Sequence, residues 1–369
     1  MRILFLSSVF DGGSPQSQRA LAHALNLRGN DVRLLIDDQR SARLSRVVGE
    51  RLADASVRFS HSPVIQVVAA LPGKRPRLRE IDGLAHWTSP HPHNALPYVL
   101  DEFLPDVVVG SSVDRHSWRR ALEICAAREI PTVIYFREVE ALGHLEIKPR
   151  AANVVVANAK TLARAAEQRG HGCAFVPSVI DTSATRTSTT RTRALLVNLD
   201  PSRGLELAID LATRHPEIPF TFQESWPLDD QQWNTLARRV EPLANIDLRR
   251  LREPGPELYD EARVLLAPHR VDNRPRVIVE AQTNAIPAIV SNYPGLIEAS
   301  GDAAIVLDED DVDGWSAALR TLWEDHDAYD EVVAATEQAA TRPELDPSYV
   351  AGEFEDLIRQ LGVAPQTPS

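Results

Sequence analysis

The stretch "VDNRPRVIVEAQTNAIPAIVSNYPGLIEASG" runs from Val271 to Gly301 and is the most informative segment of this 369-residue chain. Two acidic residues, Asp272 and Glu280, bracket a short apolar run, and a second apolar run, "AIVS", leads into the turn "NYPG". A helix that follows a strand offers free N–H groups at its N-terminus, and these favour anions. The segment therefore predicts an anion site close to carboxylates that can accept hydrogen bonds from hydroxyl groups.

Short apolar runs alternate with helix-like stretches along most of the chain. Runs such as "RILFLSS", "DVRLLID" and "PDVVVGSS" are strand-like, whereas "SQRALAHALNLRG" has apolar residues at helical spacing. Near-continuous Val, Ile and Leu runs indicate strands that are buried on both faces. Strands and helices in alternation predict βαβ units and parallel sheets, which bind ligands beyond the carboxyl ends of their strands.

The alternation is interrupted by "DTSATRTSTTRTR" at residues 181–193, which has no apolar periodicity and predicts a linker. We expect an N-terminal domain at residues 1–180, a C-terminal domain at 194–345, and a final helix within 346–369 that packs back on the N-terminal domain. The predicted fold class is α/β, with two Rossmann-like, doubly wound parallel-sheet domains that face each other across a cleft.

Composition limits the classes of function. The formal net charge of −12 argues against general binding to nucleic acid or to anionic membranes. The two cysteines are far apart in sequence, which suits a reducing, cytoplasmic location and disfavours a disulfide framework. No apolar run approaches the ~20 residues of a membrane span, and "MRILFLSSVF" fits a first strand better than a signal peptide. A homodimer is left open.

Several residues near the predicted strand ends suit a phosphorylated ligand. Arg203, in "DPSRG", places a guanidinium after the strand-like "ALLVN", and arginine suits bidentate phosphate contacts. Gly13 belongs to a double-glycine loop whose backbone can approach a phosphate. The N–H groups of Gly295 and Leu296 are expected to face a phosphate, and the Glu280 carboxylate is expected to accept hydrogen bonds from a ribose diol.

These segments resemble the retaining GT-B glycosyltransferases of the family 4 type, the glycosyl transferases group 1. Asp272 to Glu280 resembles the E-x7-E motif of that family, here as D-x7-E, and "VEAQTNAIPAIVSNYPGLIEASGDAAIVLD" resembles the segment that follows it. "LVNLDPSRGLELAIDLA" is similar to the strand, loop, Lys-Gly pair and helix of the family. "SSVFDGGSPQSQRALAHALNLRGNDVRLL" and "FVPSVID" are similar to the start and the end of its first domain.

The resemblance implies a glycosyltransferase that moves a sugar from a nucleotide-diphosphate sugar, a UDP- or GDP-sugar, to a hydroxyl acceptor. It implies retention of anomeric configuration, an acceptor bound by the first domain, and neither a metal nor another cofactor. The residues expected in the site are, as catalytic, Asp272 and Arg137 and, as substrate-binding, Glu280, Arg203, Gly13, Gly295, Leu296, Pro294, Arg274 and His269.

The chain departs from the family pattern at several of these positions. Aspartate replaces the first glutamate of the motif, and arginine replaces the lysine of the Lys-Gly pair. The other departures are Asn273-Arg274-Pro275 for Gly-Phe-Gly, Asn198 for an arginine, Pro294 for a glycine, and Arg137-Glu138 for a His-Asp pair. These changes motivate an alternative, a non-catalytic nucleotide-sugar-binding protein or partner subunit with a degenerate GT-B site.

Two further patterns have structural interpretations beside the functional ones. "HWTSPHPH" brings His86, His91 and His93 close in sequence, but prolines and irregular spacing favour a loop over a metal cluster. The acidic run from Leu307 to Trp315 precedes a predicted helix, where acidic side chains stabilise the helix dipole. Another enzyme class, an epimerase or phosphorylase of the same fold, also remains open, although no lysine follows Lys160 to hold pyridoxal phosphate.

Overall fold

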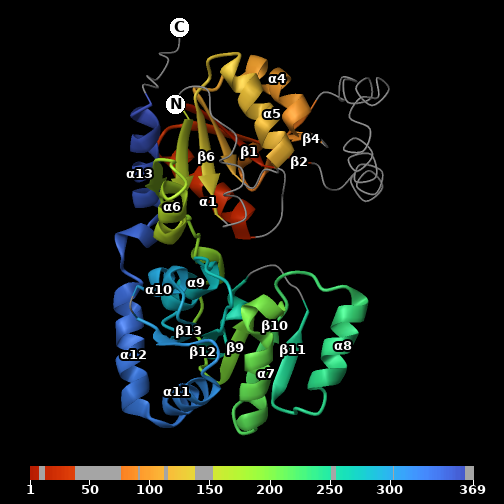
Figure 1. Cartoon of the computed structure of the whole chain (residues 1–369), viewed down its shortest axis with the longest axis vertical. Helices are drawn as coiled ribbons and strands as arrows, with labels where there is room; N and C mark the ends of the chain where they lie inside the picture. Colours follow the sequence, from red (N-terminus) through yellow and green to blue (C-terminus); the bar gives the residue numbers. More distant parts are fainter. Residues whose placement is uncertain are drawn as a thin grey trace. The chain divides into compact units, whose positions relative to one another are not determined.

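The computed structural model describes residues 1–7, 13–37, 76–89, 92–111, 115–137, 153–250, 255–301 and 303–361. The chain forms two compact units (Figure 1). The N-terminal unit comprises Met1–Asn158, Leu162–Val179 and Pro347–Ser369, and the C-terminal unit comprises Ala159–Thr161 and Ile180–Asp346. The chain therefore returns to the N-terminal unit after completing the C-terminal one.

The N-terminal unit contains an 8-stranded sheet in the order β3-β4-β2-β1-β5-β6-β7-β8, in which only the β3–β4 pair is antiparallel among the described strands. Its strands are β1 (Arg2–Ser7), β2 (Asp31–Asp37), β3 (Arg77–Ile81), β4 (Leu84–Ser89), β5 (Val107–Ser111), β6 (Thr132–Phe136), β7 (Asn153–Ala157) and β8 (Cys173–Phe175). Its helices are α1 (Gly13–Leu27), α4 (Pro92–Phe103), α5 (Arg115–Ala126), α6 (Lys160–Glu167), which begins in the C-terminal unit, and α13 (Pro347–Arg359).

Helices α1 and α13 pack together on this sheet (Figure 1). The Phe354 ring of α13 stacks on the rings of Phe5 in β1 and Tyr135 in β6, with centroids 6.3 and 5.8 Å apart. Buried Glu355 of α13 accepts a hydrogen bond from Arg28 at 2.8 Å. The predicted first strand is confirmed as β1, whose residues 3–7 are all buried.

Helix α5 approaches β5 closely at Gly110. A Cβ atom at this position would overlap the buried Trp118 ring of α5, so only glycine allows the indole to lie directly on the strand. This contact fixes the helix that follows β5.

The C-terminal unit contains a 6-stranded, all-parallel sheet in the order β11-β10-β9-β12-β13-β14. Its strands are β9 (Arg193–Val197), β10 (Phe220–Gln223), β11 (Ile246–Arg249), β12 (Ala262–Ala267), β13 (Ala288–Ser291) and β14 (Ile305–Leu307). Its α-helices are α7 (Leu205–Arg214), α8 (Asp230–Val240), α9 (Arg276–Thr283), α10 (Pro294–Ser300), α11 (Val312–Glu324) and α12 (His326–Ala339). Four 3-10 turns, η3 (Ser183–Thr185), η4 (Pro201–Arg203), η5 (Pro256–Leu258) and η6 (Pro343–Leu345), connect them.

Successive residues of the central strands bury opposite faces of this sheet. Leu196 of β9 and Leu266 of β12 pack with apolar residues of α7, α8, α11 and α12. Leu195 and Leu265 pack instead with α9 and α10. Both faces are covered, which explains why successive residues in the middle of β9 and β12 are apolar.

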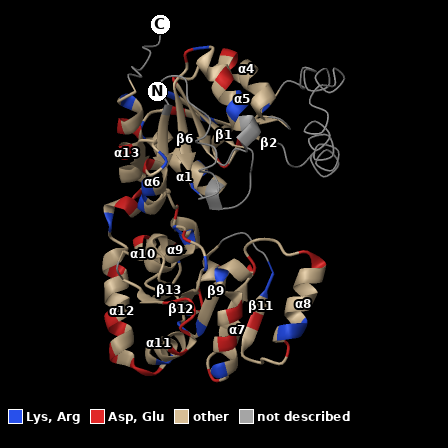
Figure 2. Cartoon of the chain, viewed as in Figure 1, with Lys and Arg blue, Asp and Glu red and all other residues tan. Residues whose placement is uncertain are grey.

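Local sequence signals place the helix ends. Asp229 and Gln232 form a reciprocal capping box at the start of α8, with hydrogen bonds of 2.7 and 3.0 Å. Figure 2 shows acidic residues at the start of α8 and basic residues at its end, and these charges complement the helix dipole. Asp311, in the acidic run noted above, caps α11 by accepting a hydrogen bond from the Gly314 amide at 2.9 Å.

The polar segment 181–193 lies against the C-terminal unit by hydrogen bonds. The Thr187 amide donates to Asn284 Oδ1 at 2.7 Å, and the Thr189 hydroxyl donates to the Ala262 carbonyl at 2.7 Å. Asn284 also donates to the Thr185 carbonyl at 3.1 Å. Threonine-rich sequence without apolar periodicity is here ordered by partners about 70–100 residues away.

Candidate functional site

The strand order of the C-terminal unit locates its ligand edge. β9 comes first in sequence and has β10 on one side and β12 on the other, so the strand order reverses between β9 and β12. In doubly wound sheets, ligands bind outside the carboxyl ends of the strands at such a reversal. The loops that follow Val197 and Ala267 are therefore the first place to look for a site.

These two loops are tied to each other. The Arg270 amide donates to the Ser202 carbonyl at 2.8 Å. Gly204 has a left-handed backbone, with φ of 81°, and a Cβ atom there would overlap the Pro268 carbonyl oxygen. Glycine at this position thus lets the β9 loop close on the β12 loop.

Arg203 and His269 meet at this reversal. Arg203 Nη1 lies 3.5 Å from His269 Nδ1, and the Arg203 guanidinium carbon lies 4.9 Å from the centroid of the Trp226 ring. His269 also lies 3.4 Å from Asn273 Oδ1. Burial, together with the Arg203 charge, lowers the pKa of His269 to about 3, so the imidazole is neutral and does not repel the arginine. Arg203 therefore presents its positive charge beside a neutral ring.

Asp272 lies on the loop between β12 and α9 and caps α10. Its Oδ1 accepts a hydrogen bond from the Gly295 amide at 2.7 Å. Pro294 is the first residue of α10, and Leu296 is fully buried. The Leu296 amide donates to the Tyr293 carbonyl at 3.0 Å. The amides expected to face a phosphate thus donate to protein acceptors, and a phosphate would have to displace Asp272 to reach Gly295.

Glu280 lies on α9 and is buried between two donors. Its carboxylate accepts a hydrogen bond from the Tyr259 hydroxyl at 2.7 Å and from Arg276 Nη2 at 2.9 Å. Burial and the Glu280 charge raise the pKa of Tyr259 well above its usual value, so this hydroxyl remains a donor. Each carboxylate oxygen has more than one acceptor direction, so these bonds leave capacity for hydroxyl groups.

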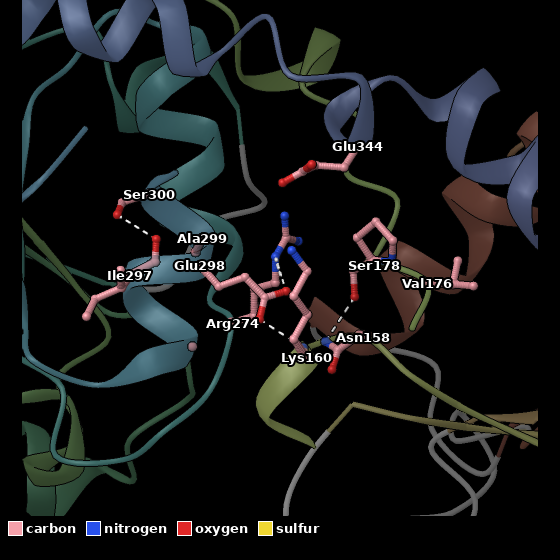
Figure 3. Close-up of polar contacts among 12 residues, drawn as sticks. Asn158, Lys160, Val176, Ser178, Arg274, Ile297, Glu298, Ala299, Ser300 and Glu344 are labelled. Carbon is pink, nitrogen blue, oxygen red and sulfur yellow. Dashed lines mark hydrogen bonds and ion pairs between the residues drawn. The ribbon is translucent and has the colours of Figure 1, made fainter. Parts of the chain in front are cut away.

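Arg274 is also buried on the loop before α9, with 1 % of its side chain exposed. Its guanidinium lies 3.8 Å from Glu298 of α10, which also accepts a hydrogen bond from the Lys160 amide at 2.8 Å (Figure 3). Burial raises the pKa of Glu298, and the neighbouring Arg274 opposes that change. The observed contacts of Arg274 are those of a residue that joins its loop to α10.

Arg137 follows β6 in the N-terminal unit and is buried. It donates to the Ser111 hydroxyl at 3.1 Å and to the Ser178 hydroxyl at 2.7 Å, and its guanidinium lies 4.3 Å from the Tyr135 ring centroid. Asn158 donates to the same Ser178 hydroxyl at 3.1 Å (Figure 3). These bonds link the ends of β5 and β6 to the segment after β8.

Some sequence candidates fall where little is described. Gly13 is the first residue of α1. The loop before Gly13, and the candidates Glu138 and His91, lie outside the described residues. His86 is buried in β4 with Nδ1 2.8 Å from the Leu84 carbonyl, and burial lowers its pKa. Within the described part of the chain, no three His, Cys, Asp or Glu residues are grouped as metal ligands.

Sequence reasoning missed three residues of this region: Trp226, Tyr259 and Arg276. Arg276 precedes Glu280 by four residues, a spacing that places both on one face of a helix and could have revealed the pair. Tyr259 follows η5 and Trp226 follows β10. No pattern in the sequence around either residue indicates that it belongs to this region.

Solved structures share this two-unit fold. HepE from Anabaena, in complex with UDP-glucose, is 14% identical, with 98% of this chain and 100% of that chain covered and a TM-score of 0.73. Sucrose-phosphate synthase from Thermosynechococcus elongatus is 10% identical, with coverages of 98% and 99% and a TM-score of 0.73. The catalytic domain of starch synthase IV from Arabidopsis thaliana, bound to ADP and acarbose, is 11% identical, with coverages of 98% and 99% and a TM-score of 0.69.

The chain therefore has the α/β GT-B fold, and the predicted fold class is confirmed. Residues 227–325 match the family model of glycosyl transferases group 1, which confirms the resemblance inferred from the sequence motifs. No curated protein sequence matches the chain. Within the described residues, no helix is both long and apolar enough to cross a membrane.

Proposed function

We propose that this protein is a glycosyltransferase that takes a sugar from a nucleoside-diphosphate sugar and transfers it to a hydroxyl acceptor. The observation that carries the proposal is the Arg203–His269 pair at the β9–β12 reversal of a GT-B fold. The match of residues 227–325 to glycosyl transferases group 1 supports the same conclusion. UDP- and GDP-sugars are the donors to test first, and HepE, a structural neighbour, was solved with UDP-glucose.

Arg203 would stabilise the leaving diphosphate. In the transfer, the bond between the anomeric carbon and the diphosphate oxygen breaks, a bond to the acceptor oxygen forms, and the acceptor hydroxyl loses its proton. Negative charge grows on the departing diphosphate, and a guanidinium already in place stabilises that charge without a metal ion. Because His269 is neutral, its ring does not repel the Arg203 guanidinium. The ring nitrogens can still form hydrogen bonds in the site.

Glu280 would bind the ribose of the donor. Its carboxylate is held in one orientation by Tyr259 and Arg276, and a fixed carboxylate can accept hydrogen bonds from two adjacent hydroxyl groups. We assign this residue to substrate binding because its role requires only an acceptor, not a proton transfer.

Asp272 would lie near the donor sugar. Its carboxylate can contact the sugar through Oδ1 only after its hydrogen bond to the Gly295 amide is broken. The Gly295 amide can contact the diphosphate only if the Asp272 carboxylate releases it, and the Leu296 amide only if it leaves the Tyr293 carbonyl. Donor binding would then free Asp272 to meet a sugar hydroxyl group. The proposal also includes transfer with retention of anomeric configuration. It includes an acceptor site in the N-terminal unit and a catalytic role for Arg137. A cytoplasmic location also belongs to it.

The test uses the purified full-length chain. A nucleotide at one hundred times its dissociation constant stabilises a protein by about 2.7 kcal/mol, so UDP and GDP should raise the melting temperature measurably. Donor turnover should follow with the correct sugar. The variant Arg203→Gln should weaken both effects strongly, whereas Arg239→Gln, which changes an exposed arginine paired with Glu206, should retain them. Absence of nucleotide binding to the unmodified chain would refute the proposal.

A non-catalytic nucleotide-sugar binder is the second candidate. The hydrogen bond that already occupies Asp272 favours it, because the carboxylate predicted to be catalytic is engaged with the Gly295 amide. This alternative predicts that nucleotides bind with the same dependence on Arg203 but that no donor sugar is hydrolysed or transferred. A broad panel of donors and acceptors, assayed for nucleoside diphosphate release, separates the two candidates.

A further inference from the structure

Trp226 is an exposed aromatic residue on the loop that follows β10. Its relative exposure is 48%, although the other large aromatic residues of this sheet, such as Phe220 and Phe222, are fully buried. β10 is the immediate neighbour of β9, so the loop lies at the ligand-binding edge of the sheet. A large, exposed indole at this edge needs an explanation other than core packing.

The indole contacts the arginine that carries the proposed function. The Arg203 guanidinium carbon lies 4.9 Å from the Trp226 ring centroid, within the range of a cation–π contact. The same guanidinium lies 3.5 Å from His269 Nδ1. An arginine side chain otherwise has large rotamer freedom, and each contact that holds it lowers the entropic cost of binding an anion.

We propose that Trp226 is a positioning residue, which holds the Arg203 guanidinium ready for the diphosphate of a nucleotide ligand. The inference rests on the proposed function, because it assigns the diphosphate to Arg203. It adds a residue from a third connection of the sheet, β10 to α8, to a site built otherwise from the loops after β9 and β12. Trp226 acts through Arg203 and does not itself contact the reacting atoms.

Stacking on the nucleobase is the competing role for an exposed indole. The two roles differ in what they predict for a ligand without a base. Pyrophosphate carries the charge that Arg203 would bind but has no ring to stack. A positioning role therefore predicts that loss of the indole weakens pyrophosphate and nucleoside diphosphates alike, whereas stacking predicts that pyrophosphate is unaffected.

The experiment measures dissociation constants of UDP, GDP and pyrophosphate by calorimetry on the full chain. Trp226→Ala should weaken pyrophosphate and the tighter-binding nucleotide about tenfold, and Trp226→Phe, which keeps an aromatic face, should restore most of the affinity. The matched control is Trp233→Phe on α8, because the guanidinium carbon of Arg250 lies 4.0 Å from the centroid of the Trp233 ring. This variant should bind all three ligands normally. Melting temperatures check that each variant is folded.

A double-mutant cycle gives the decisive readout. If Trp226 acts through Arg203, Trp226→Ala should have no further effect on affinity in the Arg203→Gln background. Equal affinities of the unmodified chain and Trp226→Ala, unchanged pyrophosphate affinity, or a full additional loss in that background would each overturn the inference and leave the proposed function intact. Failure of the unmodified chain to bind any of the three ligands would overturn both.

Discussion

Two arginines at strand ends, Arg203 in the C-terminal unit and Arg137 in the N-terminal unit, show how the same residue type can serve different purposes. Arg203 is partly exposed and contacts aromatic and imidazole rings, which leaves a charged group suited to an anion. Arg137 is buried and donates to two serine hydroxyl groups from different connections. An arginine that follows a strand in an α/β sheet is therefore a better candidate for an anion site when it is partly exposed, as Arg203 is, than when it is buried among hydroxyl groups, as Arg137 is.

The largest expected effect belongs to Arg203. We expect Arg203→Gln to lower kcat/KM for the donor by about a hundredfold, because charge stabilisation of the leaving diphosphate is lost. The melting temperature should change little, since the residue is partly exposed. Steady-state kinetics beside a thermal melt measure both. A large loss of stability with unchanged kinetics would mean that Arg203 has a structural role and does not contact the diphosphate.

Arg137→Gln should differ from Arg203→Gln by lowering the stability of the protein as well as its turnover. Removal of the guanidinium leaves the buried Ser111 and Ser178 hydroxyl groups without this donor, and we expect a loss of about 2–3 kcal/mol in the free energy of unfolding. Nucleotide affinity of the folded protein should be unchanged. Denaturant unfolding and calorimetry provide the measurements. An unchanged stability together with a loss of turnover would support the catalytic role predicted for Arg137 from the sequence.

Tyr259, the hydroxyl donor to Glu280, is the next residue to change, and a smaller effect is expected. We expect Tyr259→Phe to lower stability by about 1–2 kcal/mol, because a hydrogen bond to a buried carboxylate is lost. Nucleotide affinity should fall by a factor of about three to ten if the tyrosine orients Glu280 for the ribose. A Tyr259→Phe protein that is less stable but binds UDP or GDP normally would show that the tyrosine has no role in ribose binding.

The pH dependence of stability tests the neutral state of His269. Its pKa in the folded protein is about 3, below the usual value of 6.5, so the unfolded chain binds a proton first as the pH falls. The contribution of this residue to stability is therefore complete above about pH 6.5 and is lost as the pH falls towards 3, with a slope of up to about 1.4 kcal/mol per pH unit. His269→Gln should flatten this slope in denaturant titrations between pH 7 and 5. An unchanged slope would mean that another group causes the acid sensitivity.

The sequence predicted much of the fold because the signals for fold are local. Alternating apolar runs and helical periodicity follow from which faces are buried, and a continuous apolar run such as "VLLA" of β12 is typical of a sheet that is covered on both sides. The turn that begins α10 was likewise marked by local composition.

The contacts that define the site could not be predicted in the same way. The Asp272–Gly295 bond joins the loop after β12 to the start of α10, and the Tyr259–Glu280 bond joins the residue after η5 to α9. Trp226 reaches Arg203 only because β10 pairs with β9 in the sheet. Such contacts depend on tertiary packing, and the pattern of neighbouring residues does not encode them. The sequence therefore identified Arg203, Asp272 and Glu280 as candidates but not the partners that orient them.

A crystal structure of the full chain soaked with UDP or GDP tests the central claim most directly. We expect the diphosphate to lie beside the Arg203 guanidinium at the carboxyl ends of β9 and β12, with the ribose hydroxyl groups near Glu280. A nucleotide bound at any other place, or a diphosphate that does not contact Arg203, would contradict the account.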